Sequence, residues 1–263
     1  MAHQWSHDPA RADTPVALSL DDVAVLARSS TGVDDLDARV SVCRACPRLV
    51  AWREEVAVTR RAAYADQDYW GRPAPSFGDP DAAVLIVGLA PAAHGANRTG
   101  RMFTGDRSGD WLYAALHRAG YASQAGSTHA GDGLRLTGVR ITAAVHCAPP
   151  ANRPTPAEFA ACGGWLDREL VLMAPGMRAV LTLGGHAWSA TLASAARIGW
   201  DVPRPRPKFG HGATATIRAG DRPITVVASY HVSQQNTFTG RLTAPMLDAA
   251  IALLGPEIRP EAG

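Results

Sequence analysis

Short apolar runs alternate with longer amphipathic stretches along the second two-thirds of the chain. The apolar runs predict strands over residues 83–87, 140–147, 179–183 and 224–229. The amphipathic stretches predict helices over residues 108–119, 155–173, 185–198 and 243–254. Short, wholly apolar strands that alternate with helices are typical of a parallel sheet covered on both faces. The pattern therefore predicts an α/β fold.

The N-terminal part of the chain has a different pattern. Residues 18–57 place apolar side chains at helical spacing, and the acidic residues around Asp34 suit the positive end of a helix. Residues 62–80 contain Gly and Pro throughout and predict a loop. Residues 1–20 are polar and are expected to be flexible, which leaves one domain over residues 21–263.

Composition narrows the classes of protein that fit. Hydrophobic residues make up 46% and charged residues 19% of the 263 residues, which is an ordinary globular mixture. The net charge of +2 is far from that of a protein that binds DNA by overall charge, so any basic surface must be local. No apolar run is long enough to span a membrane, and no secretory signal is visible. We therefore expect a cytoplasmic protein whose cysteines stay reduced.

Residues 88–101 form the first candidate site. This loop directly follows the strand predicted over residues 83–87, and open α/β folds bind their ligands at that end of their strands. Glycine and other small residues in the loop allow the backbone to approach a ligand closely. The polar side chains of the loop are donors suited to a phosphate or to the edge of a base: His94, Asn97, Arg98 and Arg101.

The four cysteines fall into two pairs, Cys43 with Cys46 and Cys147 with Cys162. The first pair has C-x-x-C spacing, and the second flanks a Pro-rich turn that would fix the separation of its thiols. Four thiolates are the ligand set of an iron–sulfur cluster or of structural zinc. Spacing alone leaves both metals open, together with a set of unrelated buried thiols. Either metal would be structural, because a site with four Cys ligands has no open position for substrate.

Two further segments carry candidate chemistry. His231, Ser233 and Asn236 follow the last predicted strand, so this loop should open on the same edge of the sheet as residues 88–101. Residues 203–208 read Pro-Arg-Pro-Arg-Pro-Lys and are basic and stiff. They fit either an extended surface linker or a loop that contacts phosphates beside a DNA groove.

Together these motifs resemble those of the family 5 uracil-DNA glycosylases, which are iron–sulfur members of the uracil-DNA glycosylase superfamily. The matching segments are a Gly-Leu-Ala-Pro-Ala loop that continues to Asp106, a His-x-Ser-x-x-Asn loop and the two cysteine pairs. The resemblance extends from about Cys43 to the final helix. It implies a three-layer α/β/α sandwich with a short, mostly parallel central sheet.

The resemblance also implies an activity. Such an enzyme flips uracil out of DNA and hydrolyses the N-glycosidic bond, which leaves an abasic site for base excision repair. Relatives also remove other deaminated bases, such as hypoxanthine and xanthine. We expect a monomer whose partner is DNA that contains these bases. By resemblance, the cysteines would hold a structural [4Fe–4S] cluster, with zinc as the alternative.

Individual roles follow from the positions that match the family's motifs. Phe103 would form an aromatic floor beneath the flipped base. His231 would donate a hydrogen bond to uracil O2 as negative charge builds on the leaving base. Asn236 would help to hold the base or the DNA, and Ser233 would hold a phosphate.

The attacking water would be handled without a strong general base. Ala90 stands where many members of the superfamily carry Asp or Asn for this water. A dissociative route fits, in which the sugar becomes an oxocarbenium ion before water adds. Asn97 would orient the water, with His94 and Asp106 as further candidates. Relatives often have an Asn near Ala143 that reads the base edge, and its absence here predicts relaxed base selectivity.

Two other classes of protein stay open at this point. A non-catalytic protein that binds uracil or damaged DNA on the same fold is physically possible, because Ala90 cannot activate water. An iron–sulfur electron carrier would explain the cysteines but would leave the His231 loop unexplained.

Overall fold

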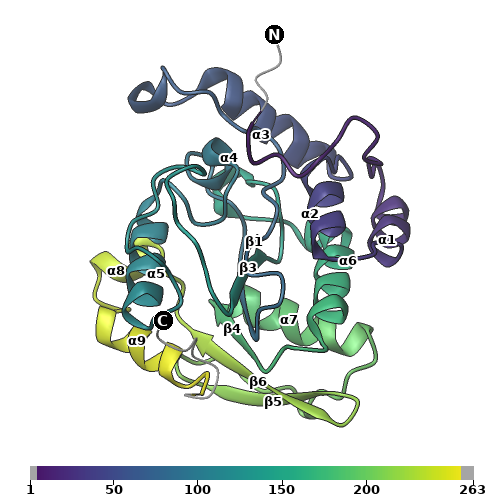
Figure 1. Cartoon of the computed structure of the whole chain (residues 1–263), viewed down its shortest axis with the longest axis vertical. Helices are drawn as coiled ribbons and strands as arrows, with labels where there is room; N and C mark the ends of the chain where they lie inside the picture. Colours follow the sequence, from purple (N-terminus) through teal and green to yellow (C-terminus); the bar gives the residue numbers. More distant parts are fainter. Residues whose placement is uncertain (1–4, 256–263) are drawn as a thin grey trace.

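A six-stranded sheet forms the centre of the computed structural model, which describes residues 5–255 (Figure 1). Its strand order is β1-β3-β2-β4-β6-β5, and β3, β2, β4 and β6 run parallel to one another. The two edge strands, β1 and β5, are antiparallel to their neighbours. The strands are β1 Phe77–Gly78, β2 Val84–Gly88, β3 Val139–Ala143, β4 Ala179–Leu183, β5 Thr214–Ala219 and β6 Arg222–Ser229.

Helices cover both faces of this sheet. The α-helices are α1 Leu20–Arg28, α2 Val33–Ser41, α3 Pro47–Thr59, α4 Ala96–Thr99, α5 Arg107–Arg118, α6 Pro156–Met173, α7 Gly185–Arg197, α8 Gln234–Phe238 and α9 Ala244–Ala252. Two short 3-10 helices span Ala62–Tyr64 and Pro150–Asn152. Figure 1 shows α5 and α9 on one side of the sheet and α6 and α7 on the other.

The sheet has one half of the hydrophobic core on each face, and a third cluster of buried residues surrounds the cysteines. Val84 and Ile86 of β2 point into the half that packs against α5 and α9. Leu85 and Val87 of the same strand point into the half that packs against α6 and α7. Since successive side chains of a strand point to opposite faces, a strand buried on both faces must be apolar throughout. The prediction of a three-layer α/β/α sandwich with a mostly parallel sheet is confirmed.

The structure differs from the predicted elements in several places. The loop predicted over residues 62–80 contains a 3-10 helix and the two-residue strand β1. The strand predicted over 140–147 ends at Ala143, where the chain turns away towards the cysteine region. The sequence analysis missed β5, whose alternating exposed and buried residues mark a half-exposed edge strand. It also treated 96–99 and 234–238 as plain loop, whereas each contains a short helix, α4 and α8.

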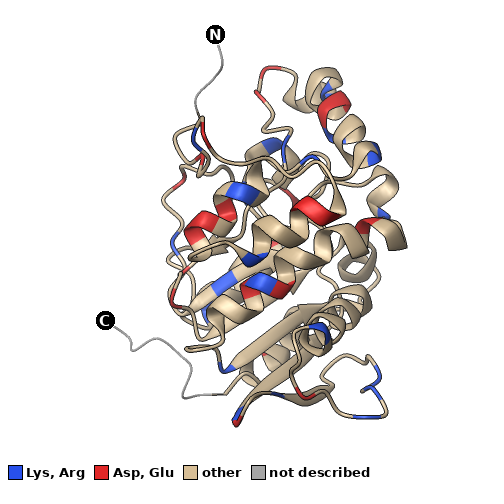
Figure 2. Ribbon diagram, turned by 90° about the vertical axis from the view of Figure 1, so that its right-hand side faces the viewer, with Lys and Arg blue, Asp and Glu red and all other residues tan. Residues whose placement is uncertain are grey.

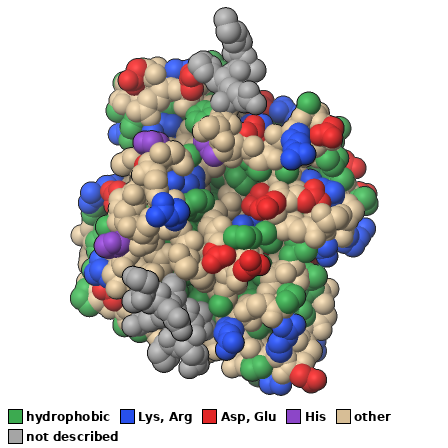
Figure 3. Space-filling view, in the orientation of Figure 1, with side chains coloured by type: hydrophobic (Ala, Val, Ile, Leu, Met, Phe, Trp, Pro, Cys, Tyr) green, Lys and Arg blue, Asp and Glu red, His purple; other side chains and the backbone are tan. Residues whose placement is uncertain are grey.

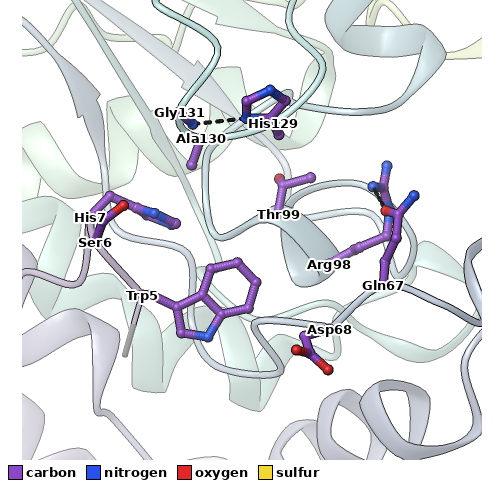
Figure 4. Close-up of a pocket in the computed structure, with 10 residues that line it drawn as sticks. All are labelled: Trp5, Ser6, His7, Gln67, Asp68, Arg98, Thr99, His129, Ala130 and Gly131. Carbon is purple, nitrogen blue, oxygen red and sulfur yellow. Dashed lines mark hydrogen bonds between the residues drawn. The ribbon is translucent and has the colours of Figure 1, made fainter. Parts of the chain in front are cut away.

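The N-terminal segment packs on the loop that precedes β1. Trp5 lies edge-on to Trp70 with ring centroids 5.7 Å apart, and His7 stacks on Trp70 at 5.6 Å. Trp5, His7 and Arg98 line a surface pocket of about 390 Å³ (Figure 4). The predicted flexibility of residues 1–20 stays a prediction, and residues 1–4 lie outside the described part of the chain. The predicted domain over 21–263 likewise includes residues 256–263, which lie outside it.

Two further features concern the surface and the helices. Lys, Arg, Asp and Glu are interspersed on the face drawn in Figure 3. Among residues 5–255, none of the helices is both long and apolar enough to cross a membrane.

Candidate active site

A cavity of about 670 Å³ lies at the carboxyl ends of β2, β3 and β6. Its volume suits a single base with its sugar. Three segments form its walls: the loop after β2, the Pro-rich turn after β3 and the loop after β6. The residues that line it are Gly88, Leu89, Ala90, Pro91, Ala92, Ala96, Met102, Phe103, Asp106, Arg107, Ser108, Ala143, Ala151, Asn152, Arg153, His231, Ser233, Gln234, Gln235 and Asn236.

The ring of Phe103 closes the cavity against the end of β2. A Cβ atom on Gly88 would lie only 2.9 Å from Cζ of Phe103, so glycine is needed for the ring to sit there. Phe103 itself has φ of 52°, a left-handed conformation that costs free energy in a bulky residue. Strain of this kind is typical of functional sites, and here it turns an aromatic face towards the cavity.

His231 faces Phe103 across the cavity, with ring centroids 6.4 Å apart. It follows β6 directly, and Nδ2 of Asn236 donates a 2.8 Å hydrogen bond to its carbonyl oxygen, which fixes the turn. Burial lowers the pKa of His231 to about 4, because the charged imidazolium loses its hydration. The imidazole is therefore neutral at pH 7 and presents one donor and one acceptor.

Asp106 is the only carboxylate among the residues that line the cavity. Its Oδ1 accepts a 2.9 Å hydrogen bond from the backbone N–H of Gly109, so it caps the N-terminus of α5. Its Oδ2 occupies the space that a side chain at residue 95 would need, since a Cβ on Gly95 would lie 1.9 Å from that oxygen. Burial raises the pKa of Asp106 above the ordinary range.

Two residues predicted to handle water are not brought to the cavity. Asn97 is fully buried, and its amide donates to the carbonyl oxygens of Arg53 at 3.2 Å and Ala93 at 3.4 Å. His94 pairs through Nδ1 with the hydroxyl of Tyr69 at 3.0 Å. The placement gives Asn97 a structural role, because its hydrogen bond ties the loop after β2 to α3.

The two arginines of this loop also point away from the cavity. Arg98 donates to the carbonyl oxygens of His94 at 2.9 Å and Gly105 at 2.8 Å. Arg101 pairs with Asp132 at 2.8 Å, and both side chains are buried. The expectation that these donors face a phosphate or a base therefore fails. They hold the loop together, and small residues form the cavity wall instead.

The structure adds Asn152 and Arg153 to the site, which the sequence analysis treated only as part of a rigid turn. Both line the cavity. Ala151 and Asn152 have φ of 52° and 55°, which marks strained backbone at the cavity rim. Their position in the sequence could have indicated this role, because the two polar residues lie between two prolines just beyond the end of a buried strand.

All four cysteines line one small apolar pocket beside the site. Cys43 follows α2, Cys46 caps α3, Cys147 follows β3 and Cys162 lies in α6. Burial raises the pKa of each thiol, of Cys46 to about 11 and of Cys147 to about 12.

The surroundings of this pocket suit an electron-rich occupant. The buried guanidinium of Arg53 donates to Sγ of Cys147 at 2.9 Å, and the backbone N–H of His146 donates to Sγ of Cys162 at 3.4 Å. In residues 5–255, no three His, Cys, Asp or Glu side chains are grouped closely enough to hold a single metal ion.

Comparison with known proteins places the chain in a family. The model of the uracil DNA glycosylase superfamily matches residues 75–255. A type-5 uracil-DNA glycosylase of Mycobacterium tuberculosis is 56% identical over 223 residues, which cover 85% of this chain and 81% of that protein. Those of Thermus thermophilus and Pyrobaculum aerophilum are 52% identical over 79% and 46% identical over 81% of this chain, and the matches cover 90% and 88% of those proteins. The chain therefore belongs to the type-5 family of the uracil-DNA glycosylase superfamily.

Proposed function

We propose that this protein is a uracil-DNA glycosylase, which hydrolyses the N-glycosidic bond of deoxyuridine in DNA and leaves an abasic site. The observation that carries the proposal is the cavity in which Phe103 and a neutral His231 face each other at the end of the sheet. Family membership supports the same activity. A monomer is the expected form. The compartment that holds the genome, the cytoplasm, is the expected location.

The base would enter this cavity only after it leaves the double helix. Extrusion of a nucleotide costs a few kcal/mol, and least for a mismatched base such as uracil opposite guanine. The ring of Phe103 would stack on the flipped base. His231 would donate a hydrogen bond to uracil O2, where negative charge develops as the bond to the sugar breaks. One such donor contributes about 3–4 kcal/mol to catalysis.

The sugar would face the side of the cavity that contains Asp106. The methyl group of Ala90 offers no base for water, so bond cleavage precedes water attack in our scheme. The carboxylate of Asp106 would stabilise the positive oxocarbenium ion, and its Oδ2 would orient the incoming water. Asn152 supplies an amide to the lining of the cavity. Ser233 and Asn236 lie on the rim, where they would contact the DNA backbone.

The range of bases extends, in this proposal, to hypoxanthine and xanthine. Ala143 lines the cavity and presents no amide to the edge of a base. A site that lacks such a hydrogen-bonding group cannot strongly reject a base whose edge carries a different arrangement of donors and acceptors. A panel of duplexes that carry uracil, hypoxanthine or xanthine opposite each normal base tests this extension. Excision of uracil alone would contradict it.

The four cysteines are proposed to hold a structural [4Fe–4S] cluster. The donor set fits, since four thiols line one pocket and Arg53 offsets negative charge on Cys147. A single zinc ion needs thiolates about 2.3 Å from the metal and therefore tightly grouped, and a cluster accepts a wider spacing. The cluster would join α2, α3, β3 and α6 and take no part in the hydrolysis. Iron and inorganic sulfide should accompany the purified protein, and zinc without iron would refute this assignment.

One duplex with a single uracil tests the proposed activity. Alkali cleaves the strand at an abasic site, so wild-type protein should yield a cut strand after alkaline treatment. Because Ala90 cannot activate water, a non-catalytic uracil-binding protein is the second candidate. A stable complex with this duplex, without cleavage after alkali, would favour that candidate.

A further inference from the structure

A basic loop of residues 203–208 connects α7 to β5, and we refer to it as the Arg-Pro loop. Its cationic residues, Arg204, Arg206 and Lys208, are all exposed. None of the three forms an ion pair with any acidic residue in the described part of the chain. Figure 2 shows this loop standing clear of the body at the lower right, with Lys and Arg positions along it. Cations without partners on a projecting loop are available for an anionic ligand.

The Arg-Pro loop is anchored at its end nearest the sheet. Nε1 of Trp188 in α7 donates a 2.9 Å hydrogen bond to the carbonyl oxygen of Pro207. The ring of Phe209 lies against Gly185, where an added Cβ would come within 3.4 Å of Cδ1. Three prolines restrict φ within the loop. The cations are thus presented on a stiff segment, so binding of a ligand costs less conformational entropy than it would on a flexible tail.

A groove lies between the base cavity and Phe209, the residue that directly follows the Arg-Pro loop. It has a volume of about 200 Å³ and contains Phe209, Tyr230 and Arg241. It shares the lining residues Leu89, His231 and Asn236 with the base cavity, so the two adjoin. Its other lining residues are Leu183, Gly184, Gly185 and His186. No carboxylate lines the groove, and the guanidinium of Arg241 lies 4.7 Å from the ring centroid of Tyr230.

We propose that the Arg-Pro loop binds backbone phosphates of the DNA strand that runs from the flipped nucleotide along this groove. The inference rests on the proposed function, because it takes DNA to be the substrate. The chain has a net charge of only +2, so a local cluster of cations has to supply attraction to DNA. Phosphate contacts fix position and carry no sequence information, so the loop should strengthen binding equally for all sequences.

The test is a triple variant, Arg204→Gln, Arg206→Gln and Lys208→Gln, compared with wild type and with a matched control. The control variant, Arg178→Gln, Arg218→Gln and Arg222→Gln, removes the same charge. These three arginines are exposed and lie at the opposite ends of the parallel strands, at the start of β4 and in the β5–β6 hairpin. Binding to a duplex with a stable abasic-site analogue is measured over a series of salt concentrations, and thermal unfolding checks the fold of each variant.

Each lost phosphate contact lowers the slope of log K against log salt by about 0.9. Loss of three contacts should lower the magnitude of this slope by about 2.7. The ratio of the wild-type binding constant to that of the loop variant should therefore fall about 40-fold between about 50 and 200 mM salt. The single-turnover excision rate at saturating enzyme should stay at the wild-type value, and the control variant should keep the wild-type slope.

Two outcomes would overturn the inference: a loop variant with the wild-type slope and affinity, or a control variant that loses as much as the loop variant. Failure of the proposed function is distinguishable, because the binding measurement does not depend on excision. Wild-type protein that binds the duplex but leaves uracil in place would refute the glycosylase activity alone. Absence of any DNA binding by wild type would refute both.

Discussion

Replacement of Asp106 separates a structural role from a chemical one. Oδ1 caps α5 through Gly109, whereas Oδ2 faces Gly95 and the cavity. Asp106→Ala removes the cap and the charge together. Asp106→Asn keeps an oxygen for the cap and the same shape beside Gly95, and removes only the charge. Asn and Asp are equally good N-caps, so the two variants should differ in stability.

The expected magnitudes follow from these contacts. Loss of an N-cap costs about 1 kcal/mol, so Asp106→Ala should unfold about 2–4 °C below wild type. Asp106→Asn should unfold close to the wild-type temperature. Both variants lose a charged interaction with the reacting sugar, and about 1.5–3 kcal/mol for such a contact corresponds to an excision rate about 10- to 150-fold lower.

Single-turnover excision of uracil from a U:G duplex, at saturating enzyme, measures the chemical role without a contribution from DNA binding. Thermal unfolding of the same preparations measures the cap. An Asp106→Asn variant that excises uracil at the wild-type rate would refute the role of Asp106 in the reaction and would leave it as a helix cap.

Further predictions concern the same region. His231→Ala should lower the single-turnover rate at least ~100-fold with little change in unfolding temperature, since one transition-state hydrogen bond is lost. Wild-type activity should not require a charged His231: with its pKa at about 4, protonation should affect the rate only as pH falls towards 4. Arg101→Met should cost about 3–5 kcal/mol of stability in denaturant unfolding, because Asp132 stays buried without its partner. The pKa of Asp132 is lowered to about 2, chiefly by hydrogen bonds from Arg101, so this stability should be present above the ordinary pKa of 3.8 and be lost as pH falls towards 2. Gly95→Ala should displace the carboxylate of Asp106 and reproduce the slow excision of Asp106→Asn; a wild-type rate would contradict this reasoning.

The strands were predictable from the sequence where burial on both faces makes a strand wholly apolar, as in β2 and β4. β5 was missed because only alternate residues are buried, in a short edge strand. The strand predicted to continue to Cys147 ends early because the apolar residues beyond Ala143 pack around the cysteine pocket instead of in the sheet. A run of apolar residues is expected both in a buried strand and around the cysteine pocket, so the sequence pattern does not separate the two.

Side-chain direction limited the prediction of the site. Phe103 and His231 were found because their motif positions dictate their place in the cavity. Asn97 and His94 were misplaced because donors in a Gly-rich loop fit two uses equally well in sequence. One use is to bind a ligand, and the other is to satisfy buried carbonyl oxygens of the loop itself. Only the folded structure distinguishes these two uses. Here the amide of Asn97 donates hydrogen bonds to the carbonyl oxygens of Arg53 and Ala93.

In the loop after β2, the residues that stabilise the loop differ from those that line the cavity, and this bears on how the site can evolve. Arg98 and Arg101 hold the loop and do not line the cavity, whereas Ala90 and Ala92 line the cavity and contribute no side-chain hydrogen bond. A substitution at either alanine therefore alters the shape or chemistry of the cavity while the scaffold of the loop stays intact. A change in the cavity wall at these positions removes none of the hydrogen bonds and ion pairs by which Arg98 and Arg101 hold the loop.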